Sequence, residues 1–233
     1  MFVDYQDFQS NLQAVNERID SACASAGRPR ESVKLLPVTK NHPAAAVRFA
    51  YQAGLFEVGE NRVQEALGKR EEVEEPVIWD LIGPLQSNKA KRAVEGFDRI
   101  QTVDRLKIAN SINRFAGEIG KTMRVLMQVN AGADPNKAGV SIDEAAVLME
   151  SILAAENLKV EGLMTIAPLD DDPEVARRCF ASLRECRDDL QDRFSVELLE
   201  LSMGMSGDMD FAIEEGSTMI RVGTALYGAR DYA

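Results

Sequence analysis

The chain has 233 residues and a net charge of −11, with a pI near 4.7. Hydrophobic residues make up 45% and charged residues 28%, which is the composition of a soluble globular protein with a sizeable core. Because binding to a nucleic acid duplex requires concentrated positive charge, the acidic balance excludes nucleic acid as a main partner. The basic cluster Lys89, Lys91 and Arg92 is too short to change this, and we interpret it as a solvated helix face.

Neither a membrane span nor an export signal is expected. The sequence contains no run of about 18 apolar residues, and its start, Met1 to Tyr5, lacks a basic region followed by an apolar one. The three cysteines, Cys23, Cys179 and Cys186, form no close pair, which indicates a reducing compartment. We therefore expect a cytoplasmic protein whose cysteines are small buried side chains.

The single histidine, His42, excludes several kinds of site. A zinc site with two histidines is impossible and no Cys-x-x-Cys pair is present, so no metal is expected. A Ser-His-Asp triad could use only His42, but the stretch Gly204 to Asp208 lacks the final glycine of a nucleophile elbow. His42 also precedes Ser206, whereas the histidine follows the serine in that fold. Hydrolase chemistry of this kind is not expected.

The pattern of apolar residues predicts alternating strands and helices after one leading helix. Residues 4–26 predict an amphipathic helix, because apolar side chains from Tyr5 to Ala22 recur at spacings of three and four before Gly27 ends it. Short apolar runs bounded by turn residues predict buried strands at residues 33–38, 56–58, 77–82, 98–103, 123–129, 158–164, 197–202 and 218–222. Helices are predicted between them at residues 43–53, 62–73, 87–95, 104–118, 141–155, 173–193 and 208–215.

Two of the predicted helices begin with capping signals. Asp104 can cap the helix that runs to Glu118. Ser141 and Glu144 have the spacing of an S-x-x-E capping box for the following helix. Before that second helix lies a longer loop, residues 130–139, which is rich in Gly, Asp, Asn and Pro.

This alternation predicts the fold. Strands that alternate with helices form a parallel sheet joined by right-handed crossovers, and eight such units close into a (β/α)8 TIM barrel of about 250 residues. An open doubly wound sheet remains an alternative, because periodicity does not prove closure. The barrel is preferred because no residues remain for a further domain. We therefore predict a single barrel domain spanning residues 1–233, with an extra N-terminal helix.

The carboxyl ends of barrel strands meet at one mouth, where the chemistry of such folds takes place. The first strand would carry the amine of Lys40 to this mouth. The second strand delivers Glu60 and Asn61, and the fifth delivers Asn130, with Lys137 on the loop that follows. For Lys40 taken alone, the alternative is a solvated strand-end lysine, since most charged side chains are exposed to water.

Two loops near the end of the chain have the chemistry of a phosphate site. Barrels often bind phosphate with the loops after strands seven and eight and with the N-terminus of a short helix. The stretch Ser206-Gly207-Asp208 precedes such a helix, and Gly223-Thr224 offers a second backbone approach and another hydroxyl. The alternative for both loops is an ordinary tight turn with a serine cap.

A phosphate site across the mouth from a strand-end lysine indicates pyridoxal 5′-phosphate as cofactor. Its aldehyde needs an amine to form a Schiff base, and its phosphate needs an anion site. Desolvation would lower the pKa of Lys40 and favour the nucleophilic amine. Arg221 could face the pyridine nitrogen and, because it keeps its proton, leave the ring a weak electron sink. The alternative for Arg221 is a salt bridge to a neighbouring carboxylate.

These residues stand in stretches that resemble the YggS/PROSC family of pyridoxal phosphate homeostasis proteins. The resemblance covers nearly the whole chain in order, and its last run is highly specific. The matching stretches are Leu35 to Lys40, Gly59 to Glu65, Ile82 to Lys89, Gln128 to Asn130, Gly162 to Pro168, Leu201 to Ser206, Gly216 to Thr218 and Arg221 to Thr224.

The resemblance implies a single barrel of the fold-type III class of pyridoxal phosphate proteins, similar to the N-terminal domain of alanine racemase. It implies a cofactor bound to Lys40. It also implies that Ser206, Gly223 and Thr224 hold the phosphate and that Arg221 lies by the pyridine nitrogen.

By the same resemblance, Asn61 would line the cofactor and Lys137 would lie near the mouth and assist cofactor transfer. The chain departs from the family at two positions. It has Asp80 and Gln101 where family members often have histidine. Neither departure touches the anchoring residues, so it puts in doubt a role for histidine near the barrel and leaves the expected cofactor binding intact.

We expect a protein that binds, buffers and delivers pyridoxal phosphate in the cell without catalytic turnover. A two-base racemase needs a second acid or base opposite the lysine, and here the chain ends at Ala233, soon after the eighth unit. An open mouth also suits exchange with water-borne ligands. The runner-up is a weak pyridoxal phosphate-dependent amino-acid racemase, and a third reading is a regulatory scaffold with an acidic docking surface. Apo forms of pyridoxal phosphate enzymes are the expected partners, and we expect a monomer.

Overall fold

Strands lie at all eight predicted places in the computed structural model, which describes residues 2–228. Their ends differ from the predicted ones by a few residues, with the largest change in the seventh strand. The strands are β1 (Lys34–Pro37), β2 (Glu57–Glu60), β3 (Ile78–Leu81), β4 (Arg99–Val103), β5 (Met123–Gln128), β6 (Leu158–Met164), β7 (Glu200–Ser202) and β8 (Met219–Val222).

The strands form one parallel sheet that curves into a nearly closed barrel. They follow one another in chain order from β2 to β8, and β1 pairs with β8. A parallel bridge between Val38 and Gly59 joins β1 to β2, and the N–H of Thr39 donates to the carbonyl oxygen of Gly59 at 3.1 Å. This order confirms the predicted barrel over the open doubly wound alternative.

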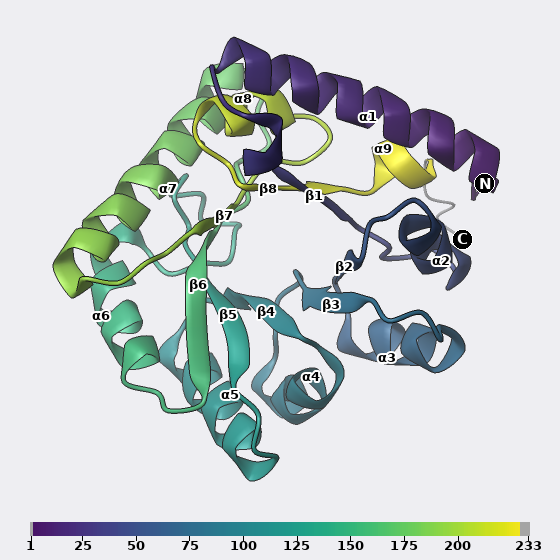
Figure 1. Ribbon diagram of the computed structural model, residues 1–233. Coiled ribbons are helices and arrows are strands. Elements are labelled where there is room, and N and C mark those ends of the chain that lie inside the picture. The colour runs from purple at the N-terminus through teal and green to yellow at the C-terminus, as the bar shows by residue number, and fades with distance from the viewer. Residues whose placement is uncertain (1, 229–233) are drawn as a thin grey trace.

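Helices surround the strands on the outside of the barrel (Figure 1). The short last helix was not predicted, because four residues are too few to show a period of 3.6. The helices are α1 (Tyr5–Ser25), α2 (Ala45–Gln52), α3 (Val63–Glu72), α4 (Ala90–Gly96), α5 (Leu106–Glu118), α6 (Ile142–Leu153), α7 (Pro173–Phe194), α8 (Met209–Glu214) and α9 (Thr224–Tyr227).

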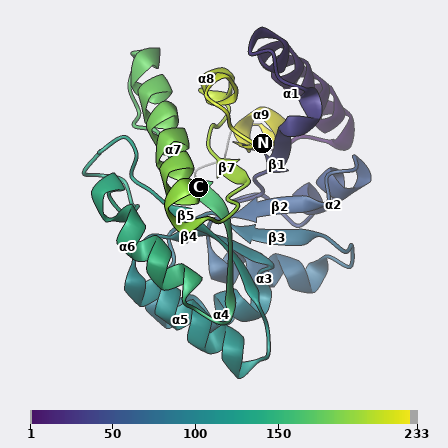
Figure 2. The ribbon, with the colours of Figure 1, turned by 60° about the vertical axis from the view of Figure 1, so that its left-hand side comes forward.

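The predicted leading helix is confirmed, and it lies along α8 and α9 on the outside of the barrel (Figures 1 and 2). Asp4 caps it by accepting from the N–H of Asp7 at 2.9 Å. Its buried face packs against α9, where the rings of Phe8 and Tyr227 are stacked with their centroids 5.2 Å apart. The helix therefore covers the elements that follow β7 and β8.

Neither predicted side-chain cap forms, although Ser141 holds the predicted N-cap position of α6. Arg105 holds the N-cap position of α5 without a side-chain cap, and Asp104 pairs with Arg105 at 2.5 Å. At α6, the hydroxyl of Ser141 donates to the carboxylate of Glu144 at 2.9 Å instead of capping the backbone. Hydrogen bonds to charged partners are stronger than neutral ones, so these side chains bind each other.

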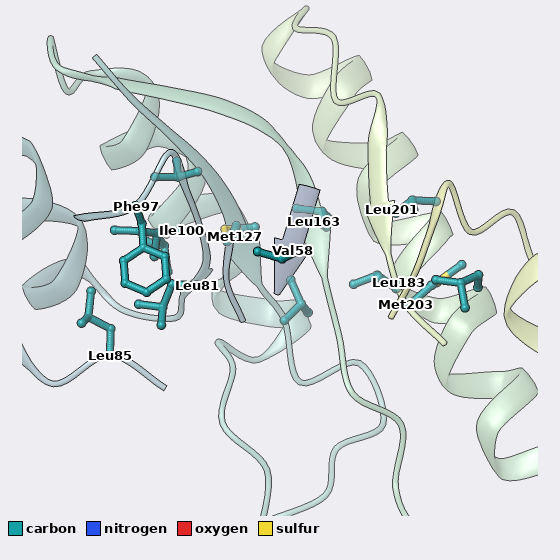
Figure 3. Close-up of a cluster of buried hydrophobic side chains, with 14 of the residues drawn as sticks. Val58, Leu81, Leu85, Phe97, Ile100, Met127, Leu163, Leu183, Leu201 and Met203 are labelled. Carbon is teal, nitrogen blue, oxygen red and sulfur yellow. The ribbon is translucent and has the colours of Figure 1, made fainter. Parts of the chain in front are cut away.

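The main hydrophobic core lies between the strands and the helices. Figure 3 shows one part of it, where Leu81, Leu85, Phe97 and Ile100 lie close together. Each of these side chains is at most 3% exposed. Burying a side chain of this size contributes about 1.5–3 kcal/mol, so the sum over many such residues holds the helices to the barrel.

The inside of the barrel is partly charged. Asp80 and Arg99 are completely buried there, because alternate strand residues face opposite sides and their neighbours face the helices. A small apolar cluster, separate from the main core, consists of Leu36, Val38, Ile82 and Met219. Within residues 2–228, no helix is both long and apolar enough to cross a membrane.

Candidate cofactor site

Lys40 lies just beyond β1, at the carboxyl end of the barrel, and is half-buried. The residues on either side of it are fixed by a buried cluster behind the strand. The hydroxyl of Thr39 donates to Glu60 at 2.6 Å, and Lys69 donates to the carbonyl oxygen of Thr39 at 2.6 Å. Lys69 also pairs with the Glu60 carboxylate at 2.6 Å. This cluster orients the segment that presents Lys40.

The residue after Lys40 is held in an unusual conformation. Asn41 has a φ of 60°, which is the left-handed region that asparagine tolerates better than most residues. Its N–H donates to the carboxylate of Glu65 at 2.5 Å. The turn that follows Lys40 is therefore held by α3, which carries both Glu65 and Lys69.

The expectation that Glu60 faces the mouth is wrong. Its side chain is completely buried between the barrel and α3, where it pairs with Lys69. Burial raises the pKa of Glu60, while Lys69 and Thr39 act against that rise. Asn130 also serves the structure, since its side chain donates to the carbonyl oxygen of Asp134 at 2.8 Å and shapes the loop after β5.

The loop after β7 contains Ser206, which is half-buried. Gly204 has a φ of +93°, and a Cβ there would lie 2.5 Å from the Cβ of Ala212, so only glycine fits this turn. The carboxylate of Asp208 accepts from the N–H of Met205 at 2.6 Å. These contacts fix the shape of the loop and leave Ser206 at the mouth.

The loop after β8 leads directly into α9. Gly223 approaches the first strand closely, because a Cβ there would lie 3.1 Å from the carbonyl oxygen of Val38. Thr224 is exposed and is the first residue of α9. The close approach brings the start of α9 beside the end of β1.

Arg221 lies inside the barrel, 4% exposed. It donates to the hydroxyl of Ser202 and to the carbonyl oxygen of Thr165, both at 2.8 Å. Burial lowers the pKa of Arg221 to about 10, although Asp208 opposes the shift, so the guanidinium stays charged at neutral pH. Within residues 2–228 it forms no direct salt bridge with a carboxylate, contrary to the alternative considered from the sequence.

A chain of hydrogen bonds extends from Arg221 into the barrel. Ser202 donates to Gln101 at 2.6 Å, and the amide nitrogen of Gln101 donates to Asp80 at 2.5 Å. Arg99 reaches the same carboxylate oxygen with two N–H groups at 2.6 and 2.9 Å. Burial raises the pKa of Asp80 to about 6, although Arg99 opposes the rise, so the carboxylate is ionised at neutral pH.

The two positions at which the chain departs from the sequence family thus contact each other. Gln101 and Asp80 lie on adjacent strands and share one hydrogen bond. Sequence reasoning found the departures but not their contact or their path to Arg221. The available signal was the period of two along each strand, which turns Asp80 inward and Trp79 outward.

A cavity of about 250 Å³ unites most of the predicted site residues. Lys40 and Asn61 line it from the first two strands, and the loops after β7 and β8 line it from the other side. Lys137 is not among its lining residues and lies half-buried on the loop after β5. The full lining is Val38, Lys40, Asn61, Ile82, Gly83, Pro84, Ile166, Met205, Ser206, Gly207, Arg221, Gly223 and Thr224.

Comparison with known proteins places this arrangement in a family. The model of the alanine racemase N-terminal domain family matches residues 4–231. A pyridoxal phosphate homeostasis protein of Aquifex aeolicus is 43% identical over 222 residues, which cover 95% of this chain and 97% of the relative. The protein of the same name from Escherichia coli is 37% identical over 238 residues, covering 97% and 98% of the two chains.

The chain belongs to the family of pyridoxal phosphate homeostasis proteins. A family member of known structure, PipY of Synechococcus elongatus, was solved with pyridoxal phosphate bound. It is 41% identical to this chain, with a TM-score of 0.81, and the match covers 92% of this chain and all of PipY. Alanine racemase of Clostridium difficile has a TM-score of 0.80 at 16% identity, over 97% of this chain and 57% of the racemase. That similarity shows a shared barrel fold.

Proposed function

We propose that this protein binds pyridoxal 5′-phosphate through a Schiff base with Lys40, and that it holds and delivers the cofactor without catalytic turnover. The observation that supports this most directly is the shared cavity, which Lys40, Ser206, Arg221 and Thr224 all line. When bound, the cofactor would supply a reactive aldehyde and an electron-withdrawing ring.

The chemical groups of the cavity fit this cofactor. The hydroxyls of Ser206 and Thr224 form no hydrogen bond with another residue of the described chain, so both are available to a phosphate. Arg221 supplies a buried cation that keeps its proton, which suits contact with an unprotonated pyridine nitrogen. We propose that Asn61 and Gly223 complete the cofactor's surroundings and that Lys137 assists transfer from the loop outside the cavity.

The lining of the cavity supports binding without turnover. Of the residues that line it in the described chain, Lys40 and Arg221 are the ionisable ones. A two-base racemase needs a second group that can give and take a proton, and arginine is a poor candidate because it remains charged. The names of the relatives agree with this reading, since they describe homeostasis of the cofactor.

The cellular role follows from the same proposal. A protein that holds a reactive aldehyde reversibly, at an open mouth, can buffer the free cofactor and pass it to apo forms of pyridoxal phosphate enzymes. We propose that it does so as a cytoplasmic monomer and as a single domain over residues 1–233. Size-exclusion chromatography with light scattering, with and without cofactor, tests the monomeric state.

Borohydride reduction tests the site directly. Reduction makes the bond between a lysine and pyridoxal phosphate permanent, and peptide mass spectrometry then locates it. We expect the pyridoxyl phosphate group on Lys40 and its loss from this position in Lys40→Ala. Lys34→Ala is the matched control, because Lys34 lies on the same strand at the opposite end of the barrel. An adduct on another lysine alone in the native chain would refute the site.

Weak racemase activity is the second candidate, because the barrel is shared with alanine racemase. Incubation of the loaded protein with L-alanine, followed by chiral analysis, separates the two functions. We expect no exchange above that of free pyridoxal phosphate. Robust formation of D-alanine that is abolished by Lys40→Ala would show that the protein is a racemase and that binding without turnover is wrong.

A further inference from the structure

A second cavity, of about 500 Å³, lies beside the candidate cofactor site. Asn61 and Pro84 line both cavities, so the two share a wall at the mouth of the barrel. The segments that line the second cavity follow the carboxyl ends of β2, β3, β4 and β5. The loops after β7 and β8, which contain Ser206 and Thr224, contribute nothing to it. It is therefore distinct from the cavity of the proposed cofactor.

The second cavity is basic, in a protein with a net charge of −11. Arg62, Lys89 and Arg105 line it, together with a single acidic side chain, Asp104. Asp104 pairs with Arg105 at 2.5 Å, so these two charges cancel. Arg62 and Lys89 therefore give the cavity its net positive charge. Arg62 and Lys89 make no side-chain hydrogen bond or ion pair with any other residue of the described chain.

The neighbouring lysine and arginine show that this basicity is local. Lys91 and Arg92, which follow Lys89 in sequence, are exposed on α4 and do not line the cavity. The sequence predicted one solvated basic face for all three residues, but Lys89 is half-buried and turns to the cavity. Arg105 is further oriented by the carbonyl oxygen of Leu85, to which it donates at 3.3 Å.

We infer that this second cavity binds a phosphate monoester anion beside the cofactor. Two unpaired cations and a third on its rim match a dianion, since each can give a charge-assisted hydrogen bond to phosphate oxygens. The cavity is larger than the one assigned to the cofactor, so it can hold a whole phosphorylated molecule. The biological role of this second site rests on the proposed function, because a second phosphorylated vitamer held beside the first would take part in exchange of the cofactor.

The test uses protein in which the first site is permanently filled. Pyridoxal phosphate is reduced onto Lys40 with borohydride, and the product is titrated calorimetrically with pyridoxine 5′-phosphate, which has no aldehyde. We expect one further equivalent to bind. The double variant Arg62→Ala/Lys89→Ala should weaken this binding at least about tenfold, because it removes two charge-assisted contacts. The control variant Lys91→Ala/Arg92→Ala, which removes the same number of charges outside the cavity, should leave it within about twofold of the parent.

Two further ligands show whether the phosphate or the pyridine ring of the ligand is responsible for binding. Inorganic phosphate should compete for the site, and pyridoxine without a phosphate should not bind. Absence of binding to the reduced protein at millimolar pyridoxine 5′-phosphate, or binding that the double variant leaves unchanged, would overturn the inference. Because Arg62 is exposed and Lys89 half-buried, both variants should keep the parent's thermal unfolding temperature, which is measured in parallel.

Failure of the proposed function would give a different result. If reduction leaves no adduct on Lys40, the cofactor proposal fails, and the second site is then tested on the untreated protein with inorganic phosphate. Binding that is lost in Arg62→Ala/Lys89→Ala but kept in Lys40→Ala would still support the second site. Binding that depends on Lys40 and not on the other two residues would refute it.

Discussion

Arg18, in the helix that precedes the barrel, donates a hydrogen bond of 2.6 Å to the carbonyl oxygen of Ser206, in the loop after β7. The same guanidinium binds both oxygens of Asp210 in α8. About two turns earlier in α1, the side chain of Asn11 donates to the carbonyl oxygen of Leu226 in α9 at 3.0 Å. The extra helix therefore contacts the loop of Ser206 and the short helix α9 that begins at Thr224, the two segments to which we assign the phosphate.

Replacement of Arg18 by alanine should weaken cofactor binding without removing it. The variant loses the contact that fixes the loop of Ser206, while the hydroxyl itself remains. A hydrogen bond from a charged donor contributes about 1.5–3 kcal/mol when buried, and Arg18 is partly exposed, so we expect a loss of affinity of roughly three- to tenfold. Titration of pyridoxal phosphate absorbance in the apo protein measures it.

Arg114→Ala is the matched control for this prediction. Arg114 is a helix arginine with its own acidic partner, Glu118, at 3.8 Å, on the distant α5. The control variant should bind the cofactor as the parent does. Equal affinities for Arg18→Ala and the parent would show that α1 does not set the geometry of the loop.

Gln101 is predicted to position Arg221 through Ser202. Gln101→Leu removes both the acceptor of the Ser202 hydroxyl and a donor to Asp80, so the arginine loses the support behind it. We expect a shifted absorbance or fluorescence maximum of the bound cofactor, because the charge near the pyridine nitrogen moves. A buried polar group that loses its hydrogen-bond partner destabilises the folded protein by about 1–3 kcal/mol. The free energy of unfolding of Gln101→Leu, measured with urea, should fall by this amount.

Gln128→Leu provides the comparison for Gln101. Gln128 is also a buried strand glutamine, and it donates to the carbonyl oxygen of Ala138 at 3.0 Å and takes no part in the hydrogen bonds that join Arg221, Ser202, Gln101 and Asp80. This variant should lose stability but keep the spectrum of the bound cofactor. An unchanged spectrum in Gln101→Leu would show that Gln101 stabilises the barrel but does not position Arg221 at the cofactor.

The three thiols should be unreactive in the native protein. Burial raises the pKa of Cys179 and of Cys186 to about 11, and it also raises the pKa of Cys23. At pH 8, a pKa of 11 leaves roughly one thiolate in a thousand, against roughly one in four for an ordinary cysteine. Iodoacetamide should therefore label all three only after unfolding, as counted by mass spectrometry.

The same shifts predict how stability depends on alkaline pH. Unfolded thiols lose their protons from about pH 8.5, while Cys179 and Cys186 in the folded chain keep theirs until about pH 11. The folded state binds more protons in this window, so the free energy of unfolding should fall as the pH rises. Labelling of either residue in the native protein at an ordinary rate at pH 8 would contradict their burial.

Much of the barrel could be predicted from the sequence because the fold depends on local patterns. The apolar runs and the turn residues between them mark each strand, and β6 begins and ends at its predicted residues, 158 and 164. Lys40, Asn61, Ser206, Arg221 and Thr224 line one cavity, because the carboxyl ends of parallel strands share one face. The order of the strands was therefore enough to identify these five side chains at the mouth.

Contacts between distant strands could not be predicted in this way. Ser202 and Gln101 are 101 positions apart in sequence, and no local pattern relates them. Glu60 was expected at the mouth, but it is the last residue of β2 and faces the helices, as Val58 does two positions earlier. The pairing of Asp104 with Arg105 also depends on side-chain reach, which a capping rule leaves out.

Lys69 gives the sharpest test of the cluster behind Lys40. Its side chain is 8% exposed, and its ammonium neutralises Glu60, which is completely buried. Lys69→Met would leave that carboxylate unpaired, so we expect a loss of about 3–5 kcal/mol in unfolding free energy. The double variant Glu60→Gln/Lys69→Met also removes the completely buried carboxylate and should recover part of this loss. Glu65, which pairs with Lys69 at 2.8 Å as well, loses that partner in both variants but is partly exposed to water. Urea unfolding of the parent and both variants measures the difference, and a single variant as stable as the double would show that Glu60 already binds a proton in the folded protein.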